Sequence, residues 1–319
     1  MILVLPSALP VPPVARELGK RLPDIAPTLA GWFAQAPAHE QALPAAETLC
    51  TPLQAWQLQQ AGYAPPPEVP LGAGWPALAA LPSDSAEPVW LANYVHLHVT
   101  QQGVVLGDTA VLQVQPDEAA QLLQAALPEL ADVGITAQPD GATGLRLFLP
   151  DALAPYAPTP AAAIGQEIQV WWSQNPASRP WRQALNAVQM AWYDHPVNVA
   201  RTRAGLPPVN GLWIFGGGRP ADFTRPSGPR PETVIDDALV APARTGDWQG
   251  WLDALAQLET QRFAPLARSL AQADAPPLQL VLAGDDRLCT LDISRVRGLA
   301  RWLPRRRHDW QQWWAPATH

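Results

Sequence analysis

The chain has 319 residues, of which 48% are hydrophobic, and a formal net charge of -7. These values predict a folded globular protein with room for one large domain or two smaller ones, and the negative charge disfavours general binding to nucleic acid or acidic membranes. No apolar run approaches the length of a membrane span, and the first residues carry no basic region before their prolines, so we expect a cytoplasmic protein without a membrane helix or signal peptide.

The first part of the chain predicts one buried strand followed by helices. Residues 1–5 form a short apolar run that ends at a proline, which is typical of a buried strand. Apolar residues at helical spacing predict helices over residues 14–22, 25–33 and 52–61. Residues 64–88 are proline-rich and predict a loop-rich boundary before the next region.

The middle of the chain predicts a group of antiparallel strands with two helices. Short apolar runs separated by glycine-containing turns predict strands over residues 89–91, 95–99, 104–106 and 110–114. A helix should begin at Pro116 and end near Leu127, and strands over residues 135–138 and 145–149 should flank a turn at Asp140 and Gly141. A linker over 155–163 and an apolar run over 168–172 precede a helix over 180–192.

The last part returns to an α/β pattern. Residues 233–240 contain strand-like pieces, residues 247–270 carry a helical apolar stripe interrupted at Pro265, and residues 278–282 read as a strand. We therefore expect an α/β fold in which residues 1–85 plus 207–319 form a discontinuous core. Residues 86–206 should form a smaller, cap-like α+β insert.

Residues 194–218 hold the densest group of chemically useful side chains. Asp194 or His195 can cap a helix, Pro196 suits its first position, and Gly205 suits the position just past its end, so a two-turn helix is expected. On that helix Asn198 and Arg201 lie three residues apart and share a face, where an amide and an exposed guanidinium could bind an anion.

A strand over residues 211–215 should follow, and three glycines let the chain turn sharply at its carboxyl end, where ligands gather in open α/β sheets. The glycines lack the Lys-Ser/Thr that follows in a phosphate-binding P-loop. The residues that we expect to line an anion-binding cleft are His195, Asn198, Arg201, Arg203, Asn210, Gly216, Gly217 and Gly218.

This segment resembles the RpfE-type regulatory protein family. That family has an Asn-Glu-x-Gln-Met run followed by His-Pro-Val-Asn, Arg, Gly, Pro, Asn and Trp-x-x-Gly-Gly-Gly, and here the run begins at Asn186 with Ala187 in place of the glutamate. The residues from Tyr94 to Leu97 are similar to the family's Asp-Pro-Val-His-Leu, with Asn93 in place of its aspartate. The resemblance implies a bacterial regulatory protein.

The same core is similar to cofactor-independent phosphoglycerate mutases, which carry a His-Pro-Asn-Arg segment, and so implies an alkaline-phosphatase-like core. Residues 258–282 resemble the helix and strand that precede a metal-binding Asp-His in that fold, but here Asp285, Asp286 and Arg287 follow. Those enzymes also place a metal-binding Asp-Gly after the first strand, where this chain has Pro6 and Ser7. The resemblance therefore implies a binding cleft without the two-metal catalytic set, a pseudoenzyme with no resident cofactor.

The rival interpretation is an active phosphomutase or phosphatase. A two-metal phosphotransferase needs several carboxylates and histidines around its cations. Asp194 and His195 are then the catalytic candidates, and Mn, Mg or Zn would be bound by Asp285, Asp286, His96 and His98. The two histidines of this set share one strand face, a spacing that can ligate a metal. Cys50 and Cys289 form no CxxC motif and are expected to be core residues.

The C-terminal stretch from residue 295 to residue 314 interleaves arginines with tryptophans. This pattern favours an amphipathic segment docked on the core, with arginine stems covering the edges of buried tryptophans. It is also compatible with an adaptor that binds nucleic acid or a protein. The leading interpretation is a cytoplasmic regulator that binds a small anionic ligand and has a protein partner.

Overall fold

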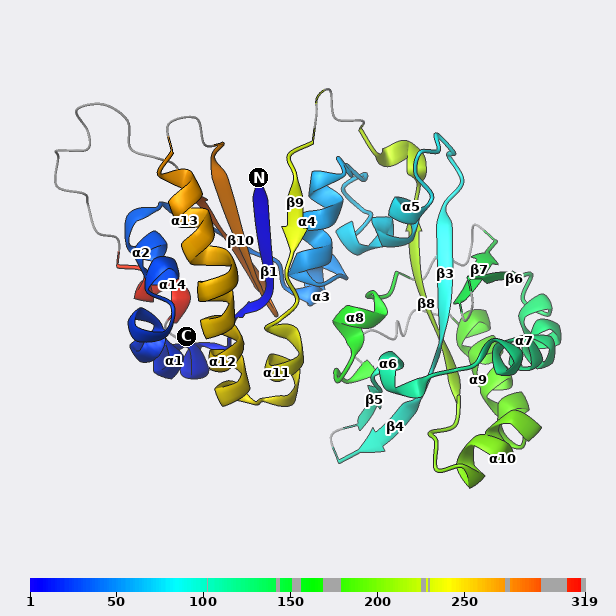
Figure 1. Ribbon diagram of the computed structural model, residues 1–319. Helices are drawn as coiled ribbons and strands as arrows, with labels where there is room; N and C mark the ends of the chain where they lie inside the picture. Colours follow the sequence, from blue (N-terminus) through cyan, green and yellow to red (C-terminus); the bar gives the residue numbers. More distant parts are fainter. Residues whose placement is uncertain are drawn as a thin grey trace. The chain divides into compact units, whose positions relative to one another are not determined.

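The computed structural model describes residues 1–101, 103–141, 144–150, 156–168, 179–224, 228, 230–272, 276–293 and 309–316. The chain divides into two compact units: one joins Met1–Pro44 to Pro226–His319, and the other is Ala45–Arg225. Both ends of the chain therefore build one unit, called the terminal unit below, and the middle builds the inserted unit (Figure 1).

The discontinuous arrangement is as expected, but its boundaries differ from the predicted 1–85 plus 207–319 and 86–206. Residues 45–85 and 207–225 belong to the inserted unit. Strand pairing explains the difference, because β8 (Gly211–Gly218) pairs antiparallel with β3 (Val89–Val95), and α5 (Trp75–Ala79) packs against β8. The strand that follows the central motif thus belongs to the insert.

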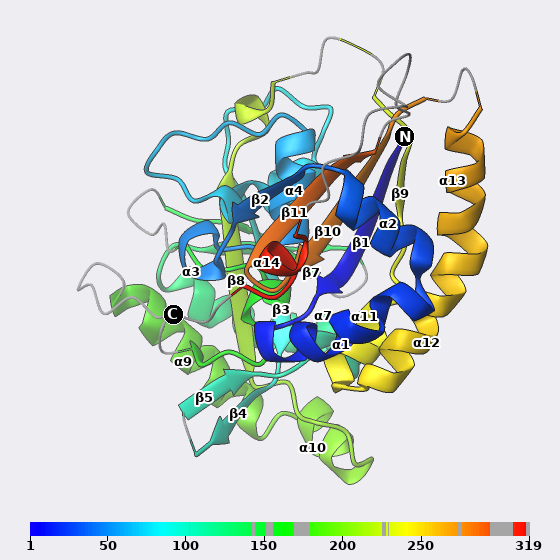
Figure 2. The same cartoon turned by 90° about the vertical axis from the view of Figure 1, so that its left-hand side faces the viewer.

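The terminal unit is a five-stranded mixed sheet in the order β2-β11-β10-β1-β9 (Figure 2). Its strands are β1 (Ile2–Leu9), β2 (Ala38–Ala42), β9 (Thr233–Ile235), β10 (Leu278–Gly284) and β11 (Arg287–Ile293). β1 runs parallel to both β9 and β10, whereas β11 is antiparallel to β10 and to β2. The carboxyl ends of β1, β9 and β10 therefore meet at one edge of this sheet.

One face of this sheet is covered by helices. The helices of the terminal unit are α1 (Pro12–Ile25), α2 (Pro27–Gln35), α11 (Val240–Thr245), α12 (Trp248–Leu258), α13 (Ala264–Leu270) and α14 (Gln311–Trp314). Leu3 and Leu5 of β1 point into a core that also contains Phe33 and Trp251. The predicted interruption near Pro265 is a π-helical turn, η5 (Glu259–Phe263), which fits because proline has no N–H to continue the helical ladder.

The described end of the chain, residues 309–316, packs into the same core. The ring centroid of Phe33 lies 4.8 Å from that of Trp313 and 5.5 Å from that of Trp314. Trp314 is buried, and its Nε1 donates to the carbonyl of Ala15 at 2.8 Å. These tryptophans are docked, as the amphipathic interpretation predicts, and the preceding arginine-rich residues 294–308 lie outside the described residues.

The inserted unit contains an antiparallel sheet in the order β6-β7-β3-β8 and a separate hairpin of β4 (Leu97–Thr100) and β5 (Gly103–Leu106). β6 (Thr136–Asp140) and β7 (Gly144–Phe148) flank the predicted turn. Its helices are α3 (Ala45–Thr48), α4 (Pro52–Gln60), α5, α6 (Thr109–Leu112), α7 (Pro116–Ala131), α8 (Pro160–Ala163), α9 (Arg179–Tyr193) and α10 (Pro196–Arg203), with short 3-10 turns η1 (Leu71–Gly74) and η4 (Pro220–Asp222). None of the described helices in either unit combines the length and apolar character needed to cross a membrane.

Two local predictions for the inserted unit are wrong. Residues 110–114 are not a strand, because Thr109–Leu112 forms the turn α6 and Gln113 has a φ of 46°, which ends any extended run. The three glycines of the central motif are not a turn, because β8 continues through Gly218. The predicted apolar run over residues 168–172 lies almost wholly outside the described residues.

Candidate functional site

The predicted two-turn helix of the central motif is confirmed as α10. His195 is its N-cap, and the Nδ1 of His195 accepts a hydrogen bond from the backbone N–H of Val197 at 3.3 Å. Pro196 begins the helix, and Gly205 lies just beyond its end with a φ of 73°. These start and stop signals depend only on neighbouring residues, which is why the sequence located them.

Asn198 uses its side chain inside the protein. Its Nδ2 donates to the carbonyls of Trp192 at 2.8 Å and Val209 at 2.7 Å, and its Oδ1 accepts from the N–H of Val209 at 2.8 Å. Only 3% of the residue is exposed. Both amide hydrogens are therefore already donated, and the residue ties the segment after α10 to the end of α9.

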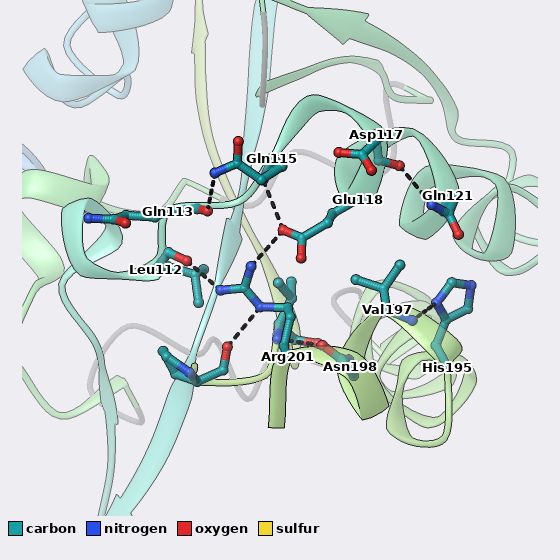
Figure 3. Close-up of polar contacts among 12 residues, drawn as sticks. Leu112, Gln113, Gln115, Asp117, Glu118, Gln121, His195, Val197, Asn198 and Arg201 are labelled. Carbon is teal, nitrogen blue, oxygen red and sulfur yellow. Dashed lines mark hydrogen bonds and ion pairs between the residues drawn. The ribbon is translucent and has the colours of Figure 1, made fainter. Parts of the chain in front are cut away.

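Arg201 is buried as well, with 1% of its surface exposed, so the predicted exposed guanidinium is wrong. Its Nη1 donates to Glu118 Oε2 at 2.6 Å, its Nε donates to the carbonyl of Pro207 at 2.9 Å, and its Nη2 donates to the carbonyl of Leu112 (Figure 3). Glu118 Oε2 also accepts from the N–H of Gln115 at 2.9 Å, which caps α7. The face of α10 that carries Arg201 packs against the start of α7, where the carboxylate of Glu118 pairs with the guanidinium.

Two further side chains join the same segment to the start of β4. Asn210 accepts from the N–H of Leu97 at 2.6 Å and donates to its carbonyl at 2.7 Å. The Nδ1 of His96 lies 2.8 Å from the carbonyl of Pro208. Since a carbonyl oxygen only accepts, the Nδ1 of His96 carries the proton of this hydrogen bond.

These contacts define a clamp, by which we mean Asn198, Arg201 and Asn210 together with Glu118 and His96. It fixes residues 205–210 against α7, α9 and the junction of β3 and β4. Three of the residues expected to grip an anion are therefore occupied in holding the fold together. The physical reason is that their partners are backbone groups and one carboxylate that the fold has removed from water. Of the other predicted side chains, Arg203 is exposed and His195 is half-buried.

The three glycines serve packing. Gly216 and Gly217 have φ values of 114° and 97°, at a bulge where Val89 and Trp90 of β3 oppose β8. A Cβ on Gly216 would lie 2.4 Å from the carbonyl oxygen of Val89, and one on Gly217 would lie 2.5 Å from the indole of Trp90. A Cβ on Gly218 would lie 2.5 Å from the hydroxyl of Tyr63, so all three positions are filled by close neighbours.

The carboxyl edge of the terminal sheet carries the other candidate residues. Ser7 has a φ of 56°, where β1 bulges away from its register with β10. Asp236 follows β9, accepts from the N–H of Ala238 at 3.3 Å and lies 3.2 Å from the Nε of Arg262. After β10, burial raises the pKa of Asp285, the charge of Asp286 adds to the rise, and the nearby Arg287 opposes it.

The predicted metal set is divided between the units. Asp285 and Asp286 belong to the terminal unit, whereas His96 and His98 belong to the inserted unit, as do Asp194 and His195. Within the described ranges, no three His, Cys, Asp or Glu side chains are grouped so that they could hold a metal ion.

The two cysteines are buried, as expected of core residues. Burial raises the pKa of the Cys50 thiol to about 11 and that of the Cys289 thiol to about 12, so both stay protonated at neutral pH.

Two features of these sites are not apparent from the sequence. Gln115 and Glu118 have the three-residue spacing of a capping box, but nothing in the sequence links Glu118 to the central motif. The positive φ of Ser7 is not predictable from the sequence, because no residue pattern within residues 1–9 indicates it.

No family model matches the chain, and no curated protein matches it. Among solved structures, a cofactor-independent phosphoglycerate mutase from Thermoplasma acidophilum is similar at 13% identity with a TM-score of 0.41, over 100% of this chain and 95% of that one. A protein from Pyrococcus horikoshii is similar at 12% identity with a TM-score of 0.45, over 98% of this chain and 91% of that one. At these TM-scores neither similarity supports an argument about activity.

Proposed function

We propose that this chain is a non-catalytic regulatory protein of the RpfE type, with a core of the phosphoglycerate-mutase and alkaline-phosphatase kind. The RpfE type rests on the resemblance of the central motif and of residues 94–97. The absence of catalysis rests chiefly on one observation, the pairing of carboxylates with arginines at the carboxyl edge of the terminal sheet.

That pairing occurs at positions where a metal enzyme would need open carboxylates. Asp236 lies 3.2 Å from Arg262, and Asp286 lies 3.6 Å from the Nη1 of Arg287. Each guanidinium neutralises its carboxylate and repels a cation. Two-metal catalysis requires carboxylates and histidines that are free to face the metals, whereas Asp236 and Asp286 at this edge each face an arginine.

The contacts of the clamp disfavour anion binding by the buried residues of the central motif. An anion at Arg201 would have to displace the carboxylate of Glu118 and reach a side chain that is 1% exposed. The motif is therefore better explained as architecture. A small anion, if it binds the inserted unit, would use the exposed Arg203 and not the buried pair.

The test is an assay of phosphoglycerate interconversion with Mn or Mg added, together with metal analysis of the purified protein. We expect no appreciable turnover. Turnover that survives repurification, disappears in Asp285→Ala and remains in Asp253→Ala would overturn the proposal. Asp253 is a suitable control because it is an exposed aspartate on α12 whose carboxylate accepts a hydrogen bond from Gln249 of the same helix at 2.8 Å.

Ligand binding is tested separately by thermal shift against phosphates, phosphoglycerates and nucleotides. A ligand present at about 100 times its Kd stabilises the native state by about 2.7 kcal/mol. We expect at least one anion to stabilise the parent protein and to lose this effect in Arg203→Gln. If no compound in the panel stabilises the protein, the small-anion part of the proposal is wrong.

An active phosphomutase or phosphatase is the second candidate, and Ser7 favours it. A non-glycine residue at a φ of 56° costs free energy, and such residues concentrate at active sites. Ser7 also lies at the carboxyl end of β1, an interior strand that pairs with β10 and β9, where α/β proteins bind ligands. Under this candidate Ser7→Ala would abolish the turnover described above.

A further inference from the structure

The inserted unit brings two histidine rings together where β3 passes into β4. His96 lies between the two strands and His98 lies in β4. The centroids of their imidazole rings are 5.6 Å apart, with an angle of 39° between the ring planes. His96 is half-buried and His98 is exposed, so the pair is open to solvent on one side.

The tautomer of His96 suits metal binding. Its Nδ1 donates to the carbonyl of Pro208 at 2.8 Å, which leaves the Nε2 of the neutral ring with a free lone pair. A hydrogen bond from the second ring nitrogen to a backbone carbonyl is the usual way in which proteins orient a metal-binding histidine. The carbonyl of Pro208 is itself held in place, because Arg201 fixes Pro207 and Asn198 fixes Val209, the residues on either side of it.

His98 is held on the same side of the chain by Gly107. A Cβ on Gly107 would lie 3.3 Å from the Cε1 and 3.4 Å from the Nδ1 of His98, so the ring packs against this glycine. The N–H of Gly107 in turn donates to the carbonyl of His96 at 2.9 Å. The backbone of one histidine thus anchors the residue against which the other histidine rests.

The ring separation matches that of two imidazoles on one metal. With metal–nitrogen distances of about 2.0 Å, a metal lies about 3.2 Å from each ring centroid, so at a tetrahedral angle the centroids are about 5.2 Å apart. The observed centroid separation of 5.6 Å is close to this value, and a small rotation of either side chain would close the difference.

We propose that His96 and His98 form a two-histidine site for a divalent transition metal that prefers imidazole, such as copper, nickel or zinc. His96 contributes Nε2, His98 contributes one ring nitrogen, and water completes the coordination. No third His, Cys, Asp or Glu ligand is grouped with them in the described part of the chain, so the metal is exchangeable and differs from a closed structural zinc. This site is independent of the proposed function.

The experiment is titration of the full-length, untagged protein with Ni²⁺ and with Zn²⁺ by isothermal calorimetry. His96→Gln and His98→Gln each remove one imidazole, and His39→Gln is the matched control because His39 is an exposed strand histidine in the terminal unit. We expect one equivalent of exchangeable metal to bind the parent and His39→Gln, and an affinity at least about tenfold lower in each of the other two variants. Circular dichroism of every variant verifies folding.

A second measurement does not depend on the variants. Ni²⁺ is paramagnetic and should broaden the imidazole proton signals of His96 and His98 before those of any other histidine. The proposal is overturned if the parent binds no metal, if only one of the two variants loses affinity, or if broadening begins at other histidines.

Discussion

Arg201→Gln should destabilise the protein strongly, although the residue lies on a short surface helix. The substitution removes the guanidinium from Glu118 and from the carbonyls of Pro207 and Leu112. Breaking a buried ion pair on one side costs about 3–5 kcal/mol. Because the Glu118 side chain is 18% exposed and keeps the N–H of Gln115, we expect a loss near the lower limit, about 3 kcal/mol.

The matched control is Arg203→Gln on the same helix, which is exposed and should change the free energy of unfolding by less than about 0.5 kcal/mol. Urea unfolding followed by circular dichroism gives the difference, and hydrogen exchange of residues 205–210 localises it. Glu118→Gln combined with Arg201→Gln should lose less than the sum of the single variants, because no unpaired charge remains. If Arg201→Gln is as stable as Arg203→Gln, the clamp does not stabilise the fold and the reasoning fails.

Three further outcomes follow from the same structure. Burial raises the pKa of the Asp285 carboxyl above its ordinary 3.8, so the folded state binds this proton more tightly and the stability of the fold falls as pH rises through the raised pKa. Asp285→Asn should therefore raise the melting temperature at pH 7 and not at pH 3. Equal shifts at the two pH values would contradict this. Gly217→Ala should lower the free energy of unfolding more than Gly205→Ala, because both glycines have positive φ but only a Cβ at Gly217 would contact the indole of Trp90. Equal losses of about 1 kcal/mol in unfolding titrations would show that backbone strain alone determines the effect. Trp314→Ala should lower the free energy of unfolding by about 3–5 kcal/mol, since the residue is 1% exposed. A variant of unchanged stability that loses affinity for single-stranded nucleic acid would instead support the interpretation of the C-terminal stretch as a nucleic-acid adaptor.

The sequence by itself determined most of the local structure. Helix α10 was predicted because His195, Pro196 and Gly205 act on the backbone within one or two residues of their own position. The strand at residues 278–282 and the turn at Asp140 and Gly141 were also predicted, because alternation and turn chemistry are short-range properties.

Only the tertiary structure decided which unit β8 joins and which polar side chains are buried. Arg201 lies on a helix of the expected length, but its partners Glu118 and Leu112 are 83 and 89 residues away in the sequence. Periodicity gives the face of a helix on which a residue lies, not what covers that face. Whether a guanidinium meets solvent, a ligand or a buried carboxylate depends on contacts between distant segments, and those contacts made a predicted anion site into part of the fold.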